Sequence, residues 1–480
     1  MASPIFLLLI LTFFSFKISP AHSFLVLPLS HSVSTTQFNT THLLLKSYAA
    51  RSASRFRRHR QVSLPLSPGS DYTLSLSLGS QTISLYMDTG SDVVWLPCHP
   101  FECILCEGKY SPSSITNPGP LNLTSATTVG CKSAACSAVH SSLPSSDLCA
   151  IAKCPLETIE ISDCKSFPCP PFYYAYGDGS FVAELYEDTF SIPMSRPPLK
   201  LPKFTFGCAN SALGEPIGVA GFGRGLLSLP AQLANKSPDI GNYFSYCLVS
   251  HGFDPTRFHR PSPLVLGRYD EIKSRKQFAQ SRVLYTYTPM LDNPKHPYFY
   301  CVGLESISIG NTRIQAPTSL KRVDGRGNGG MVVDSGTTFT MLPKKFYNSV
   351  VREFASQIGS GRRRASRVEE RTGLSPCYYG NRGEKKLMGN VPQLAFHFVG
   401  NSTVAMPRKN YLYEFYDGDA KRKVGCLMLM DGGDEADSDG GPAGLLGNYQ
   451  QQGFEVAYDL ELKRVGFARR KCASLWDTLN

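Results

Sequence analysis

Two short segments of the chain carry residue types suited to acid–base catalysis. Residues 85–91 read Leu-Tyr-Met-Asp-Thr-Gly-Ser and residues 331–337 read Met-Val-Val-Asp-Ser-Gly-Thr, so each places an aspartate after an apolar run. Hydrolysis of a peptide bond needs a base that activates water and an acid that protonates the departing amide. Two close carboxylates can supply both, because they share one proton and titrate as a pair. Asp88 and Asp334 are therefore the candidate catalytic residues.

The residues next to each aspartate suit that chemistry. Gly90 and Gly336 permit a tight turn that brings backbone N–H groups to the carboxylates. Four hydroxyl side chains can hold the two carboxylates coplanar; they are Thr89, Ser91, Ser335 and Thr337.

The two segments belong to a longer internal repeat. An apolar-apolar-Gly element follows each, Val219-Ala220-Gly221 in the first half and Leu445-Leu446-Gly447 in the second. A single Asp-Thr-Gly or Asp-Ser-Gly is an ordinary turn sequence. Two copies in matching contexts indicate two lobes of one β plan, which must face each other across a cleft to bring the aspartates together.

The elements that position these residues are expected to be mostly strands. Regular structure is expected to begin at Asp71, where apolar and polar residues alternate with period two, and short β-like runs with Gly and Pro continue from there. Helical periodicity is convincing at 344–358 and weaker at 226–234. Residues 361–371 and 431–441 are expected to be surface loops.

The N-terminus predicts export. Residues 1–23 resemble a signal peptide, with an apolar run too short to span a bilayer, and no later segment resembles a membrane anchor. Seven of the eleven excess positive charges lie in residues 1–70, which contain no acid. We interpret residues 24–70 as a removable basic prosegment that pairs with acidic groups, although a solvated, disordered run is the simpler reading. The remaining charge argues against nucleic-acid binding.

The cysteine content also fits an oxidising compartment. Fifteen cysteines include a dense group between residues 98 and 169, which predicts a disulfide-stapled loop and one leftover buried thiol. Zinc at Cys103 and Cys106 is the alternative, but no matching His pair is present, so no metal or cofactor is expected. Three sequons predict surface glycosylation at Asn122, Asn235 and Asn401.

The motifs together resemble the pepsin-like family of aspartic peptidases, and within it the plant nepenthesin-like branch. The resemblance spans about residues 71–472. It rests on the two Asp motifs with Trp95, on 176–180 (Tyr-Gly-Asp-Gly-Ser), on 446–452 (Leu-Gly-Asn-Tyr-Gln-Gln-Gln), and, for the branch, on the Cys-rich insertion and on 244–248 (Phe-Ser-Tyr-Cys-Leu).

The resemblance implies a fold and residue roles. It implies a bilobal, pepsin-like acid protease fold with pseudo-two-fold symmetry, an N-terminal lobe at 71–283 that carries the insertion at 98–169, and a C-terminal lobe at 284–480. Asp88 and Asp334 would hold the attacking water. Tyr176, with Gly177 and Asp178, would form a flap over substrate and hydrogen-bond toward Trp95.

The resemblance also implies disulfide pairs. They are Cys106–Cys169, Cys377–Cys426, Cys208–Cys472 and Cys98–Cys103, with the connectivity of 131–164 left open and Cys301 an extra cysteine beside Cys247.

The implied activity is an aspartic endopeptidase with an acidic pH optimum, acting on proteins or peptides as a monomer, because each chain supplies both aspartates. The expected location is the apoplast or cell wall, with the vacuole as an alternative. A rival interpretation is a catalytically silent protein on the same fold that inhibits cell-wall glycosidases, since a fold alone does not prove activity.

Overall fold

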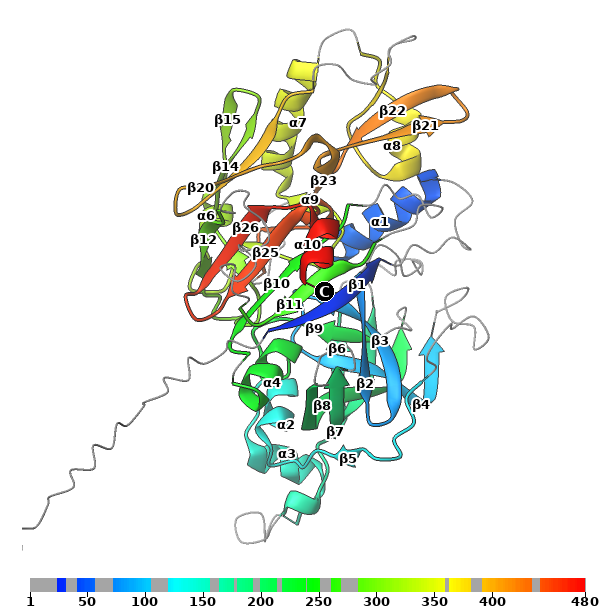
Figure 1. Cartoon of the computed structure of the whole chain (residues 1–480), viewed down its shortest axis with the longest axis vertical. Helices are drawn as coiled ribbons and strands as arrows, with labels where there is room; N and C mark the ends of the chain where they lie inside the picture. Colours follow the sequence, from blue (N-terminus) through cyan, green and yellow to red (C-terminus); the bar gives the residue numbers. More distant parts are fainter. Residues whose placement is uncertain are drawn as a thin grey trace, which may run out of the picture.

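The computed structural model describes residues 24–31, 41–56, 72–104, 120–155, 164–176, 179–192, 199–213, 218–238, 240–250, 260–268, 284–358, 362–380, 391–433 and 441–479. The fold is mostly β, as predicted, and consists of two lobes with a sheet between them (Figure 1). Strands β2 to β9 build the N-terminal lobe, and β13 to β24 build the C-terminal lobe.

The N-terminal lobe forms from alternating strands. In β2 (Tyr72–Leu78) every second residue is buried, and β2 pairs antiparallel with β3 (Gln81–Asp88), which ends at Asp88. The lobe continues with β4 (Val94–Ile104), β5 (Thr127–Thr128), β6 (Phe172–Ala175), β7 (Ser180–Ile192), β8 (Leu199–Leu213) and β9 (Val219–Gly221). Its helical parts are α2 (Ala134–Val139), α3 (Ser145–Ile151), η2 (Cys164–Ser166) and α4 (Leu229–Lys236).

The C-terminal lobe repeats the plan around β16 (Met331–Val333) and β24 (Gly444–Leu446). Its other strands are β13 (Cys301–Val302), β14 (Leu304–Ile309), β15 (Thr312–Gln315), β17 (Thr340–Leu342), β18 (Cys377–Tyr379), β19 (Leu394–Phe398), β20 (Ser402–Ala405), β21 (Leu412–Asp417), β22 (Arg422–Leu427) and β23 (Leu429–Asp431). Its helices are α6 (Thr318–Lys321), α7 (Lys344–Ile358), α8 (Ser366–Thr372), η3 (Arg408–Asn410), α9 (Asn448–Gln451) and α10 (Cys472–Leu479).

A sheet made from distant parts of the chain joins the lobes. In it β10 (Tyr243–Cys247) pairs with β25 (Phe454–Asp459) and with β11 (Ser262–Leu266), while β26 (Arg464–Arg469) pairs with β25 and with β12 (Thr286–Leu291). Strand β1 (Leu25–His31) pairs with β11 and with β2 (Figure 1). The N-terminal segment is therefore bonded to both the joining sheet and the N-terminal lobe.

The helix expected at 344–358 is confirmed as α7, whose apolar residues face the core. The weaker helix is α4, which begins three residues later than expected, because the Ser228 hydroxyl accepts from Ala231 N and caps it.

Two expectations about irregular segments were wrong. Regular structure begins before Asp71, because β1 is held by strand pairing and α1 (Thr41–Phe56) buries apolar residues against the C-terminal lobe. The basic stretch at 361–371 is not simply a surface loop, because α8 begins at Ser366 and buries Val368 completely beside α1. Of the acidic stretch 431–441, residues 434–440 lie outside the described part.

Of the disulfides expected, Cys377–Cys426 is present, between paired residues of β18 and β22. Three pairings implied by the resemblance were wrong, because the fold brings other pairs of Cα atoms within disulfide distance. Cys208 pairs with Cys98, since β4 and β8 run side by side; Cys472 pairs with Cys247; and Cys169 pairs with Cys136. Cys103 is disulfide-bonded, though not to Cys98, and Cys106 lies outside the described residues.

The Cys-rich insertion carries two further bridges, Cys131–Cys149 and Cys154–Cys164. Cys301 is a buried free thiol, and burial raises its pKa to about 12. It therefore stays protonated and inert at physiological pH.

Candidate active site

Each aspartate lies at the end of a buried strand. Asp88 and Asp334 are 2% and 4% exposed. Gly90 N donates to Asp88 Oδ1 at 2.9 Å, and Gly336 N donates to Asp334 Oδ1 at 2.8 Å. The tight turns predicted at the two glycines are therefore formed, and each directs a backbone N–H at its carboxylate.

Parallel neighbouring strands support both aspartates in the same way. Strand β3 runs parallel to β9, and β16 runs parallel to β24, so each apolar-apolar-Gly element lies beside its aspartate-bearing strand. Phe222 N donates to the Asp88 carbonyl at 2.7 Å, and Asp334 N donates to the Leu446 carbonyl at 3.1 Å. The internal repeat of the sequence is thus a repeat in space.

The two catalytic loops bind each other through buried side-chain hydroxyls. Thr89 Oγ1 donates to the Val333 carbonyl at 3.0 Å and accepts from Ser335 N at 2.9 Å. Ser335 Oγ donates to the Met87 carbonyl and accepts from Thr89 N, both at 3.0 Å. The arrangement is nearly symmetric, and it joins one lobe to the other at the aspartates.

Close packing brings the Asp88 loop onto the Asp334 carboxylate. A Cβ atom added to Gly90 would lie only 2.9 Å from Asp334 Oδ1, so a side chain at residue 90 would collide with it. The sequence-based pairing of the two aspartates is therefore realised in the geometry, with one carboxylate held against the loop that carries the other.

The remaining two hydroxyls differ from each other. Thr337 Oγ1 donates to Asp334 Oδ2 at 2.5 Å, as expected. Ser91 Oγ is buried and has no hydrogen-bond partner among the described residues. The expectation that Ser91 holds the Asp88 carboxylate is therefore not met by this conformation.

An aromatic cluster in the N-terminal lobe includes the predicted flap tyrosine and Trp95. Trp95 Nε1 donates to Tyr176 Oη at 2.7 Å, and Trp95 also stacks on Phe181 with 4.1 Å between ring centroids. Phe181 belongs to β7, which pairs with β6 to form the predicted hairpin. Gly177 and Asp178, the other flap residues expected, lie outside the described residues.

Two buried tyrosines, Tyr246 and Tyr458, lie behind the aspartates, and the sequence did not predict them as part of the site. Tyr246 and Tyr458 share a hydrogen bond of 2.9 Å between hydroxyls, and Tyr458 Oη also lies 3.3 Å from the Val333 carbonyl. Burial raises the pKa of both tyrosines well above the usual value. They remain neutral donors beneath Asp334. Tyr458 carried no sequence signal, since its contact depends on how β10 and β25 pair.

Helix α1 reaches the catalytic loops. Ser52 Oγ accepts from Phe339 N at 3.1 Å, and the Arg51 guanidinium lies 5.9 Å from the centre of the Tyr86 ring, two residues before Asp88. Ala53 packs against a cluster that includes Met341 and Leu445. The C-terminal half of α1 therefore occupies space beside the candidate active site.

The start of α1 is held by ionisable groups. His42 Nε2 lies 3.7 Å from Asp417 Oδ1, and His42 Nδ1 lies 3.3 Å from Arg371 Nη2. Burial and the Arg371 charge lower the pKa of His42, against the opposing effect of Asp417 and Asp419. The docked helix therefore favours a neutral histidine.

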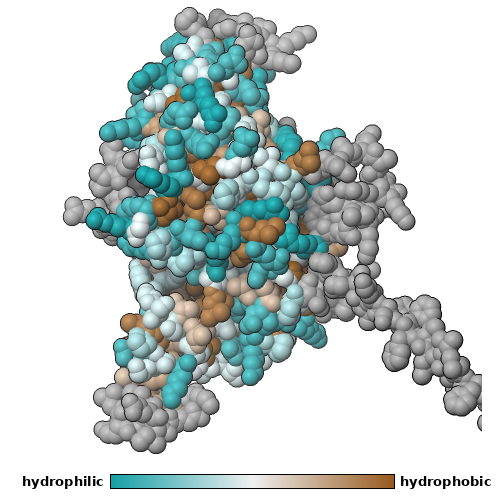
Figure 2. Space-filling view, turned by 90° about the vertical axis from the view of Figure 1, so that its left-hand side faces the viewer, coloured by the Kyte–Doolittle hydropathy of each residue, from teal (hydrophilic) through white to brown (hydrophobic). Residues whose placement is uncertain are grey.

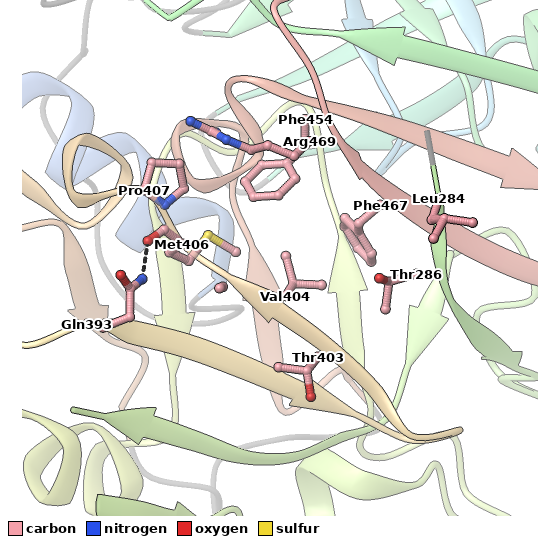
Figure 3. Close-up of a pocket in the computed structure, with 11 residues that line it drawn as sticks. Leu284, Thr286, Gln393, Thr403, Val404, Met406, Pro407, Phe454, Phe467 and Arg469 are labelled. Atoms are coloured by element: carbon pink, nitrogen blue, oxygen red, sulfur yellow. Dashed lines mark hydrogen bonds between the residues drawn. The ribbon is translucent and has the colours of Figure 1, made fainter. Parts of the chain in front are cut away.

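A separate pocket of about 440 Å³ lies in the C-terminal lobe, between the strands around β20, β25 and β26 (Figure 3). Gln393 closes one side by donating to the Met406 carbonyl. Three of its apolar lining residues, Met406, Phe454 and Phe467, are at least 95% buried, whereas Leu284 at its edge is 80% exposed. Neither aspartate lines it, so it is not the substrate site.

The structure also places the predicted glycosylation sites and one cluster of potential metal ligands. The side chains of Asn122, Asn235 and Asn401 are exposed, as acceptors of glycans must be. Cys136, His140 and Cys169 bring their ligand atoms within 4.8 Å of one another, but the two cysteines form a disulfide and offer no thiolate.

In the described part of the chain, no helix is long and apolar enough to cross a bilayer. The face seen in Figure 2 mixes hydrophobic residues, singly or in small groups, with hydrophilic ones. Such mixing is usual for the surface of a folded domain.

The sequence resembles characterised plant families over most of its length. Two family models match it, one described as xylanase inhibitor N-terminal at residues 72–268 and one as xylanase inhibitor C-terminal at 299–469. A probable aspartyl protease of Arabidopsis thaliana is 57% identical over 494 residues, covering 97% of each chain. The aspartic proteinase nepenthesin-1 of Nepenthes gracilis is 30% identical and covers 84% of this chain and 78% of its own.

Solved structures are similar to this chain in fold, at low sequence identity. The crystal structure of edgp superposes with a TM-score of 0.61 at 19% identity, covering 94% of this chain and 96% of that chain. Basic 7S globulin from soybean gives a TM-score of 0.58 at 19% identity, covering 94% and 99%.

Proposed function

This chain belongs to the pepsin-like family of aspartic peptidases, in its plant nepenthesin-like branch, and on that premise we propose that it is a secreted aspartic endopeptidase in which Asp88 and Asp334 activate one water molecule. One carboxylate takes a proton from the water as it attacks the scissile carbonyl. The other carboxyl group, protonated, polarises that carbonyl and then supplies the proton that the leaving amine needs. Substrates are proteins or peptides, cleaved at acidic pH.

The mutual binding of the two catalytic loops carries this proposal. Acid–base catalysis by a carboxyl pair requires the two groups to be held in one geometry while they exchange a proton. The Thr89 and Ser335 hydroxyls tie the loops together with buried hydrogen bonds. Such a network places the two loops in the fixed geometry that a carboxyl pair needs for acid–base catalysis.

A catalytically silent inhibitor is the second candidate, because both matching family models are described as xylanase inhibitors. A silent protein has no reason to keep both aspartates, both glycine turns and the Trp95–Tyr176 hydrogen bond. The complete set therefore favours the peptidase.

We also propose that the N-terminal segment keeps the enzyme inactive until it is cut. The contacts of Ser52 and Ala53 beside Phe339 and Met341 support this, since a helix there excludes substrate. The disulfides in the described part of the chain support export to the apoplast or cell wall. Each chain supplies both aspartates, so we propose that a monomer is active.

The test is cleavage of denatured haemoglobin or casein from pH 2 to 8, before and after removal of the N-terminal segment, with and without pepstatin. Acid activity that pepstatin suppresses and that Asp88→Asn or Asp334→Asn abolishes would establish the mechanism. Folded, processed protein that cleaves nothing at any pH, but inhibits a cell-wall glycosidase, would establish the inhibitor instead.

A further inference from the structure

A third acidic side chain lies beside the catalytic loop and has no role in the mechanism above. Asp92 follows directly on the Asp88-Thr89-Gly90-Ser91 motif. It forms no ion pair with a cation among the described residues. Burial raises its pKa above the usual value. A partly buried carboxyl group without a cation is costly to keep, and such groups are concentrated at functional sites.

The surroundings confine the Asp92 side chain on one side. A Cβ atom on Gly225 would lie 2.1 Å from Asp92 Oδ2 and 2.8 Å from Asp92 Cβ. Only glycine therefore fits at residue 225 against this side chain.

The partner of Oδ1 comes from the flap strand. Tyr174 Oη donates to Asp92 Oδ1 at 3.4 Å. Tyr174 lies in β6, two residues before Tyr176, so both tyrosines project from the same face of the strand. Their ring centroids are 5.1 Å apart, and Tyr174 also stacks on Phe181 in the paired strand.

The flap segment is thus attached at two places. Tyr176 binds Trp95 in β4, and Tyr174 binds Asp92, which lies three residues earlier in the loop before β4. We propose that Asp92 is a positioning residue, which holds β6 over the catalytic pair through the hydroxyl of Tyr174. This inference rests on the proposed peptidase function, because the flap acts on substrate only in an enzyme.

The charged and titratable groups facing this link are few. Those that bear on Tyr174 are Asp92, Tyr176, Tyr298 and Asp88. All are acids, and none of them can hold Asp92 in place of Tyr174 by a salt bridge. Loss of the Tyr174 hydroxyl therefore removes the directed contact between Asp92 and the flap strand.

The experiment compares four variants in the processed enzyme. Tyr174→Phe and Asp92→Ala remove the link, Asp92→Asn keeps an acceptor oxygen, and Tyr173→Phe is the matched control, because Tyr173 is 66% exposed on the same strand. We expect kcat/KM to fall about three- to tenfold for the first two, the size of one hydrogen bond, mainly through KM. Asp92→Asn should restore most of it, and Tyr173→Phe should change nothing.

A double-mutant cycle tests whether Tyr174 and Asp92 act through the same hydrogen bond or independently of each other. The double variant Tyr174→Phe/Asp92→Ala should be no worse than the poorer single variant. Additive losses, or Asp92→Asn as impaired as Asp92→Ala, would overturn the proposal.

A second readout does not depend on catalysis. In the full-length protein, Tyr174→Phe should speed amide hydrogen exchange in β6 and β7, and Tyr173→Phe should not. If the wild-type protein cleaves nothing, the proposed function fails, while exchange still decides whether the link holds the flap strand. Equal exchange in the two variants would refute the link even in an active enzyme.

Discussion

Ser335 offers a sharp test of how the two lobes are joined at the active site. Its hydroxyl accepts from Thr89 N and donates to the Met87 carbonyl, both at 3.0 Å, and Ser335 is 1% exposed. Ser335→Ala deletes one oxygen atom and almost no volume. Both partner groups stay buried, since water cannot replace the missing hydroxyl without opening the junction.

The magnitude follows from the two groups left behind. A buried donor or acceptor without a partner costs about 1–3 kcal/mol, so the two together lower the free energy of unfolding by about 2–6 kcal/mol. Because the lost bonds connect the loops that carry Asp88 and Asp334, kcat should fall as well.

Urea unfolding of the full-length protein measures the loss of stability, and hydrolysis by the processed enzyme measures the loss of activity. Ser402→Ala is the matched control, because the Ser402 hydroxyl is buried and has no hydrogen-bond partner among the described residues. It should leave stability unchanged or slightly raised. If Ser335→Ala unfolds at the same urea concentration as Ser402→Ala, the hydroxyls do not hold the lobes together and the reasoning is refuted.

Further predictions concern the aspartates, the helix and the disulfides. Asp88→Asn and Asp334→Asn should each lower kcat at acidic pH by about a hundredfold or more, measured as casein hydrolysis, with circular dichroism unchanged. Because docking lowers the pKa of His42, docked α1 is fully stabilised above pH 6.5, the ordinary pKa of histidine, and this stabilisation is lost as the pH falls through the lowered pKa. Limited proteolysis of α1 should therefore accelerate in acid, and less so in His42→Gln. Peptide mapping without reductant should yield the bridges described here, whereas a peptide joining Cys208 to Cys472 would contradict them.

The sequence was most informative where chemistry and local structure depend on the same residues. A strand that ends in Asp-Thr-Gly needs the glycine for its turn and the aspartate for its function, so both are visible in one motif. Repetition of that motif also implied two lobes. The α7 helix was equally clear, because one face of 15 residues is apolar throughout.

Contacts between distant segments could not be inferred in this way. Cys208 pairs with Cys98 because β4 and β8 run parallel with Leu96 opposite Cys208, and no spacing in the chain encodes that register. Tyr174 and Asp92 meet for a similar reason, since the flap hairpin folds back over the catalytic loop. An Asp four residues after Asp88 and a Tyr two residues before Tyr176 are the only signals the sequence contains.

The N-terminal segment contains helix α1 and strand β1, and activation by proteolysis would affect the two differently. Helix α1 lies beside the catalytic loops, and in the activation proposed above it leaves before substrate binds. Strand β1 completes a sheet: it pairs with β11 along five residues, and Leu27 and Leu29 are 1% and 0% exposed. Loss of β1 would uncover that apolar surface and the edge of β11, each unfavourable in water. Under the proposed activation, the enzyme therefore releases α1 while it either keeps β1 as a bound fragment or places another strand along β11.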